Sequence, residues 1–327
     1  MKIGFIGTGW FTKTHADILG EMDGVEITAF CGTSVEKAEI EARKWSKASG
    51  YANVEEMLDK QKLDAVYICV PPMAHGAIEH ALLERNIPFF VEKPIGIKDE
   101  PDAIARKVEE QGLITSVGYH WRYKDTTKKA LALLQNRKAG MALGYWMGTM
   151  PMVPWWRDVS RSGGQFMEQT THIVDLLRYL CGDIKEVYAA YNSTMMAEKV
   201  EGTTTSDVGS VIVKLQNGMV ATISNTCILP EPNKSGLEIY TDEGVLELWN
   251  HQLRDVRGKR IVEYTEQNNP YFVENQIFLD AVRTGNTSNI LSTYQDAVKT
   301  HQVTVAANQS AMTGKPISLM LEEKQEI

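Results

Sequence analysis

Residues 2–12 read KIGFIGTGWFT, and this stretch decides the fold of the first part of the chain. The apolar run over residues 2–6 predicts a buried strand, Gly7 permits a tight turn, and a helical pattern begins directly afterwards. Gly9 lets backbone N–H groups approach a pyrophosphate, and the helix N-terminus adds partial positive charge. The stretch therefore predicts a dinucleotide site rather than a plain βα turn. Its predicted contact residues are Gly7, Gly9, Trp10 and Phe11, with Thr12 where a third glycine is common.

Apolar runs alternate with helical-period segments as far as about residue 120. Strands separated by helices of this length are typical of a parallel, doubly wound sheet with helices on both faces. The fold class predicted for this part is therefore α/β. The candidate strands are Lys2-Ile6, Val25-Cys31, Asp64-Val70, Pro88-Glu92 and Ile114-Gly118, and the helices lie near Phe11-Met22, Ala74-Arg85 and Glu100-Gln111.

The pattern changes after Gly118, where helices near Asp125-Arg137 and Gln165-Leu180 precede a series of short strands. Consecutive short strands joined by tight turns indicate an antiparallel sheet. We therefore predict two domains, a nucleotide-binding domain over 1–120 and an α+β domain over 121–327. The later strands are Val187-Ser193, Asp207-Leu215, Met219-Ile228, Leu237-Thr241 and Val245-Trp249, followed by helices near Tyr271-Thr284 and Tyr294-Thr313.

Composition excludes several classes of protein. The formal net charge of −8 opposes binding to nucleic acid, since no basic cluster offsets it. A 43% share of hydrophobic residues excludes general disorder, and no apolar run is long enough to span a bilayer. The cysteines form no C-x-x-C pair, which speaks against a zinc ribbon or a disulfide framework and fits a reducing compartment. We therefore expect a cytoplasmic protein that binds neither nucleic acid nor membrane. The cysteines are Cys31, Cys69, Cys181 and Cys227.

The second predicted strand ends in residues that bear on the choice of dinucleotide. An acidic residue about 20 positions after the glycines would accept the ribose 2′-OH of NAD. The sequence has Thr33, Ser34 and Lys37 there instead, a set suited to a 2′-phosphate. This favours NADP slightly over NAD. The alternative is that Ser34 caps the next helix and Lys37 is solvated.

Two proline-containing segments follow the third and fourth predicted strands of the parallel sheet. Pro71 and Pro72 follow the former, and Glu92-Lys93-Pro94 follows the latter. The carboxyl ends of such strands line the ligand crevice of an open α/β sheet. A lysine at this edge can polarise a reacting carbonyl or hydroxyl, whereas an ordinary loop lysine is solvated.

These segments, taken with others in order along the chain, resemble the glucose-fructose oxidoreductase/inositol dehydrogenase (Gfo/Idh/MocA) family. The resemblance covers nearly the whole chain and implies a Rossmann domain followed by an α+β domain with an open antiparallel sheet. It also implies a homodimer or homotetramer. The matching segments are Pro71-x-x-x-His75, Glu92-Lys93-Pro94, Val117-Gly118-Tyr119-His120-Trp121-Arg122-Tyr123, Gly163-Gly164-x-x-x-Glu168-x-x-x-His172-x-x-Asp175, Phe278-Leu279-Asp280-Ala281-Val282-x-x-Gly285 and Ala306-Ala307-x-x-Ser310-x-x-Thr313-Gly314-Lys315-Pro316.

The resemblance assigns catalysis to Lys93 and His172, and it places Glu168 where the family has Asp. It also places His75, Glu92 and Lys93 beside the cofactor. On the helix predicted over residues 165–180, positions 168, 172 and 175 share one face. A carboxylate beside a histidine fixes its tautomer and raises its basicity, which suits a general base. The alternatives are an interior histidine and a metal site formed by Glu168, His172 and Asp175; we predict no metal.

Adjacent tryptophans just before this helix suggest a wall for a polyhydroxylated substrate. Sugars stack their C–H faces on aromatic rings and donate hydrogen bonds to polar neighbours. The alternative is that either tryptophan belongs to the core. The predicted substrate-binding residues are Tyr119, Arg122, Trp155, Trp156, Arg157 and His172.

The combined prediction is an NAD(P)-dependent oxidoreductase acting on a secondary alcohol or carbonyl of a sugar, sugar derivative or cyclitol. His172 would accept the hydroxyl proton, Lys93 would stabilise the developing alkoxide, and Glu168 would orient His172 or bind a neighbouring hydroxyl. Two alternatives stay open. One is a glycoside hydrolase that uses NAD transiently, and the other is a cofactor-sensing regulator without catalysis.

Overall fold

The computed structural model describes residues 1–98 and 100–319, so the tail of the second predicted domain, residues 320–327, lies outside the described part. The chain divides into two compact units. The first contains residues 1–123 and 269–298, and the second contains residues 124–268 and 299–327. Among the described residues, no helix is both long and apolar enough to cross a bilayer.

The described residues of the first unit form a six-stranded sheet in the order β3-β2-β1-β4-β5-β6. All its strand pairs are parallel, which is the doubly wound order of a Rossmann fold. The predicted strands are confirmed, and β3 is an addition whose three residues are too few to show a pattern. The strands are β1 (Lys2–Ile6), β2 (Glu26–Cys31), β3 (Ser49–Tyr51), β4 (Ala65–Ile68), β5 (Phe89–Val91) and β6 (Thr115–Val117).

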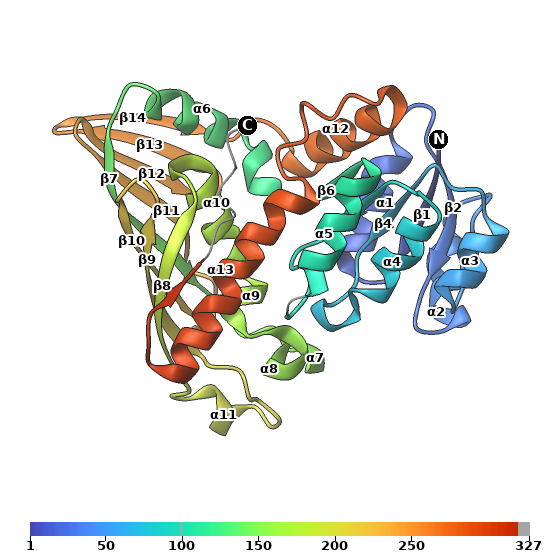
Figure 1. Ribbon diagram of the computed structural model, residues 1–327, viewed down its shortest axis with the longest axis horizontal. Helices are drawn as coiled ribbons and strands as arrows, with labels where there is room; N and C mark the ends of the chain where they lie inside the picture. The colour runs from blue at the N-terminus through green and yellow to red at the C-terminus, as the bar shows by residue number, and fades with distance from the viewer. Residues whose placement is uncertain (99, 320–327) are drawn as a thin grey trace. The chain divides into compact units, whose positions relative to one another are not determined.

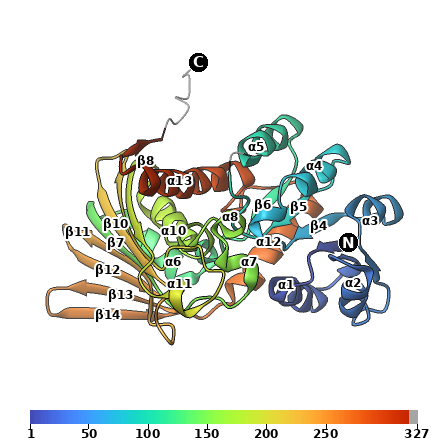
Figure 2. The same ribbon diagram turned by 90° about the horizontal axis from the view of Figure 1, so that it is seen from below.

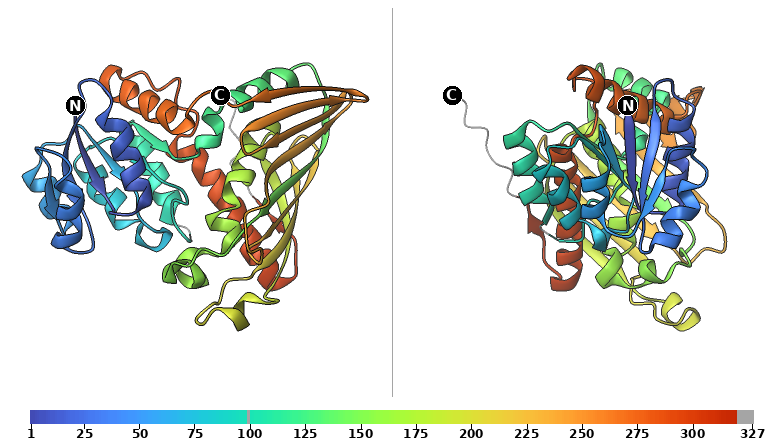
Figure 3. Two further views of the ribbon diagram at one scale, coloured as in Figure 1. Left: turned by 180° about the vertical axis from the view of Figure 1, so that it is seen from behind. Right: turned by 90° about the vertical axis from the view of Figure 1, so that its right-hand side faces the viewer.

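Helices cover both faces of this sheet (Figure 1; Figure 3, right). On one face α1, α2 and α12 pack with Phe5 and Phe90. On the other, α3, α4, α5 and the start of α13 pack with Val66 and Phe89. The helices are α1 (Trp10–Gly20), α2 (Val35–Ala42), α3 (Val54–Lys60), η1 (Pro72–Ala74), α4 (Ala77–Glu84), α5 (Glu100–Gln111), η2 (His120–Tyr123), α12 (Pro270–Thr284) and α13 (Tyr294–Thr313), the last of which continues into the second unit.

The assignment of α12 to the first unit corrects the predicted single boundary near residue 120. Phe278 and Leu279 of α12 lie in one buried cluster with Phe5 and Phe90 of the parallel sheet. The spacing of apolar residues predicts this helix correctly, but it carries no information about which core receives the apolar face. The predicted domain of residues 121–327 is therefore interrupted by residues 269–298.

The second unit contains, within its described residues, a nine-stranded sheet in the order β14-β13-β12-β11-β7-β10-β9-β8-β15. Its strand pairs are antiparallel except for the parallel pair of β7 and β10. The predicted mostly antiparallel sheet is confirmed. The strands are β7 (Ala139–Met147), β8 (Ile184–Asn192), β9 (Val208–Leu215), β10 (Val220–Thr226), β11 (Lys234–Thr241), β12 (Gly244–Trp249), β13 (Gln252–Arg257), β14 (Arg260–Thr265) and β15 (Ile317–Ser318).

Helices of the second unit lie along one face of this curved sheet (Figure 2). Buried and exposed residues alternate along β8 and β9, as expected of a sheet covered on one side. The other face exposes Met141, Tyr188 and Ile212. The additional helices are α6 (Asp125–Leu134), α7 (Pro154–Arg157), α8 (Val159–Ser162), α9 (Gln165–Glu168), α10 (Thr171–Cys181) and α11 (Met196–Lys199).

Candidate functional site

The glycine turn after β1 has the geometry that a dinucleotide requires. Gly7 has φ of +113°, and a Cβ there would lie 2.1 Å from the carbonyl oxygen of Cys69, so a side chain cannot be accommodated. Gly9 is the N-cap of α1, and no atom of the described residues lies within 4 Å of the position a Cβ would take. This open position beside the first turn of α1 fits a pyrophosphate. Trp10 is 65% exposed, and its ring packs edge-on against Phe11.

The residues after β2 form a small polar cluster. The Ser34 hydroxyl caps α2 by accepting a hydrogen bond from the Lys37 backbone N–H, so the capping interpretation of Ser34 is confirmed. The Lys37 ammonium donates to Thr33 Oγ1 over 3.1 Å. Lys37 is thus not simply solvated. A hydroxyl and an ammonium lie together where β2 ends, and their contact with a 2′-phosphate stays a prediction.

The segment after β4 contains a buried histidine–carboxylate pair. Pro71 and Pro72 lead into η1, and His75 Nδ1 lies 2.6 Å from Glu79 Oε1. The other Glu79 oxygen accepts from the Gly76 N–H at the start of α4. Glu79, which sequence reasoning missed, therefore orients His75. The four-residue spacing of the two side chains was the available signal.

Glu92 and Lys93 follow β5 at the carboxyl edge of the parallel sheet. Glu92 is 4% exposed, and its carboxylate lies 2.9 Å from His15 Nε2 of α1. Lys93 is 8% exposed, and its ammonium lies 6.0 Å from the ring centroid of Phe11. Because the turn after β1 lies at the same edge of the sheet, Lys93 and the predicted dinucleotide residues come from one side of the first unit.

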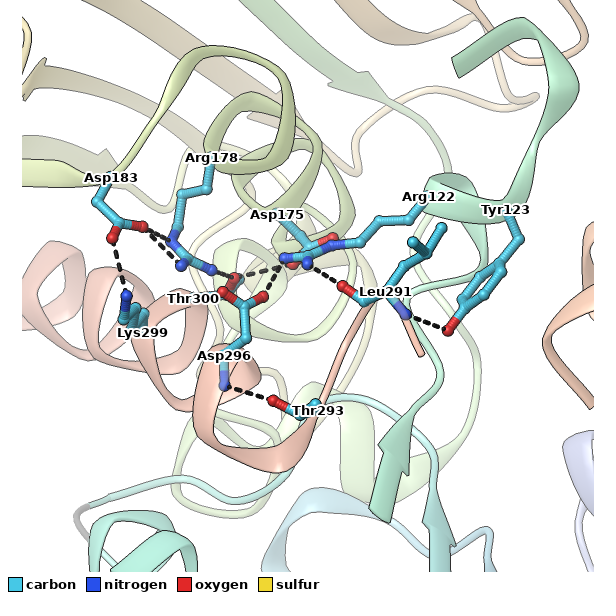
Figure 4. A network of polar contacts seen from close by, with 10 residues as sticks. All are labelled: Arg122, Tyr123, Asp175, Arg178, Asp183, Leu291, Thr293, Asp296, Lys299 and Thr300. Carbon is cyan, nitrogen blue, oxygen red and sulfur yellow. Dashed lines mark hydrogen bonds and ion pairs between the residues drawn. The ribbon is translucent and has the colours of Figure 1, made fainter. Parts of the chain in front are cut away.

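Two predicted substrate residues of the first unit are buried in η2 or next to it. Tyr119 is 1% exposed. Arg122 donates to the Leu291 carbonyl and forms an ion pair with Asp296 (Figure 4). These contacts tie η2 to the start of α13. Whether Tyr119 and Arg122 also contact a substrate stays a prediction.

In the second unit, His172 lies in the first turn of α10 and is 5% exposed. Its ring stacks on the indole of Trp146 in β7, with centroids 5.8 Å apart and planes within 17°. Trp146 is a neighbour that sequence reasoning missed, because β7 itself was not predicted. The stacking fixes the plane of the imidazole.

The helix that carries His172 is interrupted, which corrects the single helix predicted over residues 165–180. Glu168 is the last residue of α9, and α10 starts at Thr171. At the break, the Thr170 N–H donates to the Gln165 carbonyl, five residues back. Positions 168, 172 and 175 therefore do not share the face of one helix.

Glu168 has a partner from the predicted substrate wall. The Trp156 indole N–H donates to Glu168 Oε2 over 2.7 Å. Trp156 is 1% exposed and packs with Met150 and Cys227, so the core interpretation holds for this tryptophan in the structure. Trp155 is half-buried beside this cluster.

Arg157, the last residue of the predicted wall, is anchored by its neighbours. Its guanidinium donates to the Glu201 carbonyl over 3.2 Å. Its own carbonyl accepts from the backbone N–H groups of Thr204 and Thr205. The segment after α11 therefore holds Arg157 in place.

Asp175, which was predicted to share a helix face with Glu168 and His172, belongs to a polar network on α10 and α13 (Figure 4). Its carboxylate accepts from the Thr300 hydroxyl over 2.9 Å, and Thr300 accepts from Arg178. Arg178 and Lys299 both bind Asp183. Asp175 is thus directed into α13. Among the described residues, Glu168, His172 and Asp175 do not form a group able to hold a metal ion.

Comparisons with known proteins identify both parts of the chain. A model described as an oxidoreductase family with an NAD-binding Rossmann fold matches residues 1–119, and a GFO/IDH/MocA C-terminal domain model matches residues 137–247. A scyllo-inositol 2-dehydrogenase (NAD(+)) of Bacillus subtilis is 25% identical over 98% of this chain and 96% of its own. A myo-inositol 2-dehydrogenase of Thermotoga maritima is 23% identical over 87% and 89%.

Solved structures show the same fold. GenD2 from gentamicin A biosynthesis, in complex with NAD, superposes with a TM-score of 0.85 at 18% identity. The match covers 98% of this chain and 97% of GenD2. At this identity the likeness establishes the fold alone.

Proposed function

Because this chain belongs to the GFO/IDH/MocA family of NAD-binding oxidoreductases, we propose that its substrate is a secondary alcohol or ketone of a sugar, sugar derivative or cyclitol. The family and the relatives make the chain an NAD(P)-dependent dehydrogenase acting on CH–OH groups. The inositol dehydrogenases among the relatives support the cyclitol class.

The observation that carries the proposal is the placement of Lys93. Lys93 directly follows the buried, hydrogen-bonded Glu92 at the carboxyl edge of the parallel sheet. The open turn at Gly9 lies at the same edge. A lysine in that position is placed to contact a bound ligand, because α/β folds bind their ligands in the crevice at the carboxyl edge of the sheet.

In the proposed mechanism, His172 accepts the substrate hydroxyl proton as general base, and Lys93 stabilises the negative charge that develops on the substrate oxygen. Glu168, held by Trp156, binds a neighbouring hydroxyl or orients His172. Gly7, Gly9 and the first turn of α1 would hold the pyrophosphate of a dinucleotide, whose nicotinamide would supply or accept the hydride.

We propose that NADP is used at least as well as NAD. The cluster of Thr33, Ser34 and Lys37 supports this preference, because an ammonium that donates to a hydroxyl at the end of β2 can also donate to a phosphate. Thr33, Ser34 and Lys37 offer no carboxylate to a ribose 2′-OH. The carboxylate of the neighbouring Glu36 is hydrogen-bonded to Ser34.

The proposal includes a homodimer or homotetramer in the cytoplasm. Exposed Met141, Tyr188 and Ile212 on the uncovered face of the nine-stranded sheet support self-association. The cysteines lie far apart in the sequence and form no C-x-x-C pair, which favours a reducing compartment.

The test is a screen of cyclitols, sugars and sugar acids with NAD and with NADP, following the absorbance of the reduced nicotinamide. We expect oxidation of a subset of cyclitols or sugars. Release of sugar from glycosides without net cofactor reduction would instead establish a hydrolase. Tight cofactor binding without turnover of any substrate would establish a regulator.

A further inference from the structure

A fully buried group of ionisable side chains lies in the first unit, next to Lys93, and the proposed mechanism does not use it. It consists of His15 from α1, Glu92 after β5 and Glu274 from α12, which are 0%, 4% and 0% exposed. One polar atom from each lies within 4.8 Å of the others. Two carboxylates and one imidazole therefore share one buried site.

Glu92 is fixed in this group from two sides. His15 Nε2 lies 2.9 Å from Glu92 Oε1, and His15 Nδ1 lies 3.0 Å from Asn275 Oδ1, so both ring nitrogens are engaged. On the other side, a Cβ on Gly118 would lie 2.7 Å from Glu92 Oε1, so the backbone itself abuts the carboxylate. The Glu92 side chain therefore lies between His15 and the Gly118 backbone.

Glu274 lacks such support. Among the described residues, neither of its carboxylate oxygens has a hydrogen-bond partner. An ionised carboxylate buried without a partner is costly, and two carboxylates that share a site do not both ionise near neutral pH. In agreement, burial, followed by the charge of Glu92, raises the pKa of Glu274 well above its ordinary value of 4.5.

Among the described side chains grouped with Glu274, His15 can carry positive charge, and its Nε2 faces Glu92. The phenols and the thiol nearby are neutral acids. Burial raises the pKa of Tyr67, of Cys69 and, to about 12, of Tyr123. The titratable groups that face or influence Glu274 are His15 from α1, Tyr67 from β4, Cys69 after β4, Glu92 after β5, Tyr123 from η2 and Tyr271 from its own helix.

We propose that Glu274 is a protonated, uncharged acid in the folded protein and that it acts through Glu92 as a positioning residue for Lys93. A proton on Glu274 leaves the group with one carboxylate charge, on Glu92, which His15 holds. Loss of that proton would place two like charges within 4.8 Å, and repulsion would displace Glu92 from His15. The positioning role rests on the proposed function of Lys93, whereas the protonation of Glu274 does not.

The first test measures the proton without any substrate. Because the folded pKa lies above the unfolded one, the folded state keeps a proton that the unfolded state releases above about pH 4.5. The folding equilibrium constant of the wild type should therefore fall about tenfold per pH unit relative to Glu274→Gln, until the pH passes the folded pKa. Urea titrations between about pH 5 and pH 8 measure this difference. Parallel pH curves for the two proteins would overturn the proposal.

An infrared spectrum gives a second readout that does not depend on unfolding. The folded wild type at neutral pH should show the C=O band of a protonated carboxylic acid, and Glu274→Gln should lack it. Absence of that band from the wild type would contradict the assignment. So would a stoichiometric divalent metal in the purified protein that is lost in Glu274→Gln, because the metal would then occupy the place of the proton.

The positioning role needs an activity readout. Glu274→Ala should lower kcat about tenfold while cofactor affinity stays within about twofold, and Glu274→Gln should recover most of kcat because the amide keeps the shape of the neutral acid. In a plot of kcat against pH, the alkaline limb should move to higher pH in Glu274→Gln. Gln276→Ala, at an exposed position of the same helix, is the matched control.

The outcomes separate the two proposals. Equal kcat profiles for wild type, Glu274→Gln and Glu274→Ala would refute the positioning role even if the proton is present. If the infrared band and the pH-dependent stability are found but no sugar or cyclitol is oxidised, the proposed substrate class fails and the protonation of Glu274 stands.

Discussion

The Trp156 indole N–H donates a 2.7 Å hydrogen bond to Glu168, the carboxylate proposed to serve the substrate or His172. Trp156 is buried, so its effect on a substrate would act through Glu168 rather than through an exposed stacking face. Trp155, its half-buried neighbour, is the better candidate for direct stacking.

Removing the indole N–H tests this relationship. Trp156→Phe keeps an aromatic ring but removes the indole donor to Glu168, so kcat/KM should fall about 10- to 100-fold, since a hydrogen bond to a charged group contributes about 1.5–3 kcal/mol. Cofactor affinity should stay unchanged. Trp155→Phe is the comparison, because it makes the same exchange of rings without removing the bond to Glu168, and it should lower kcat/KM less than Trp156→Phe does. Equal effects of both substitutions would show that the hydrogen bond has no role in catalysis.

The dinucleotide preference should follow the residues after β2. Thr33→Asp should shift the preference toward NAD, because a carboxylate accepts the ribose 2′-OH and repels a 2′-phosphate. Lys37→Ala should weaken NADP binding more than NAD binding. Isothermal titration with both cofactors measures the two affinities. A wild-type protein that binds NAD about a hundredfold tighter than NADP, which is about 2.7 kcal/mol, would refute the predicted preference.

The two proposed catalytic side chains should act as a unit. Lys93→Ala and His172→Ala should each lower kcat by about 10²- to 10⁴-fold while both variants still bind cofactor. The double variant should lose less than the product of the two single losses. The pH profile of the oxidation rate should have a limb that requires a deprotonated group, and this limb should disappear in His172→Ala. If His172→Ala keeps both its activity and that limb, Lys93 becomes the leading candidate for the base.

Acid stability of the second unit should depend on a buried ion pair. Arg137 donates two hydrogen bonds of 2.8 Å to Asp255, and these lower the pKa of the Asp255 carboxyl. Asp255→Ala should cost about 3–5 kcal/mol of unfolding free energy at neutral pH, because the buried Arg137 charge loses both hydrogen bonds and keeps the 3.7 Å contact with Glu243. The difference from wild type should shrink below about pH 4, as Asp255 is protonated.

A solvent-exposed ion pair of the same sheet provides the control for this experiment. Glu263 pairs with Arg254, and the Glu263 side chain is 55% exposed. Glu263→Ala should therefore change the free energy of unfolding by less than about 1 kcal/mol. Urea titrations at neutral and acidic pH compare the two variants. An equally small effect of Asp255→Ala would mean that the Arg137–Asp255 pair does not stabilise the sheet.

The turn after β1 should not tolerate a side chain. Gly7→Ala would place a Cβ against the Cys69 carbonyl at a positive φ, so we expect loss of dinucleotide binding together with a lower unfolding temperature. Gly24→Ala is a useful control, because Gly24 also has a positive φ but a Cβ there meets no atom within 4 Å. A Gly7→Ala protein that binds cofactor normally would contradict the assigned role of the turn.

Local patterns in the sequence are sufficient to predict the parallel sheet and its glycine turn. β1, β2, β4, β5 and β6 are short apolar runs because both faces of a parallel strand are buried, and this signal requires no knowledge of neighbouring residues. The same reasoning failed for β7, where Gly140 and Gly144 interrupt the apolar pattern, and for β13, where charged residues alternate with apolar ones on a half-exposed strand.

Only the tertiary structure decided which residues meet across long separations. The sequence shows Glu274 as one acid in an amphipathic helix, and nothing local indicates that α12 packs on the first unit and buries that acid beside Glu92 and His15. Likewise, the sequence places Glu168 near His172 along the chain, but the break at Thr170 and the bond to Trp156 depend on packing. Hydrophobic periodicity is a property of each segment, whereas burial of a particular carboxylate depends on which segments share a core.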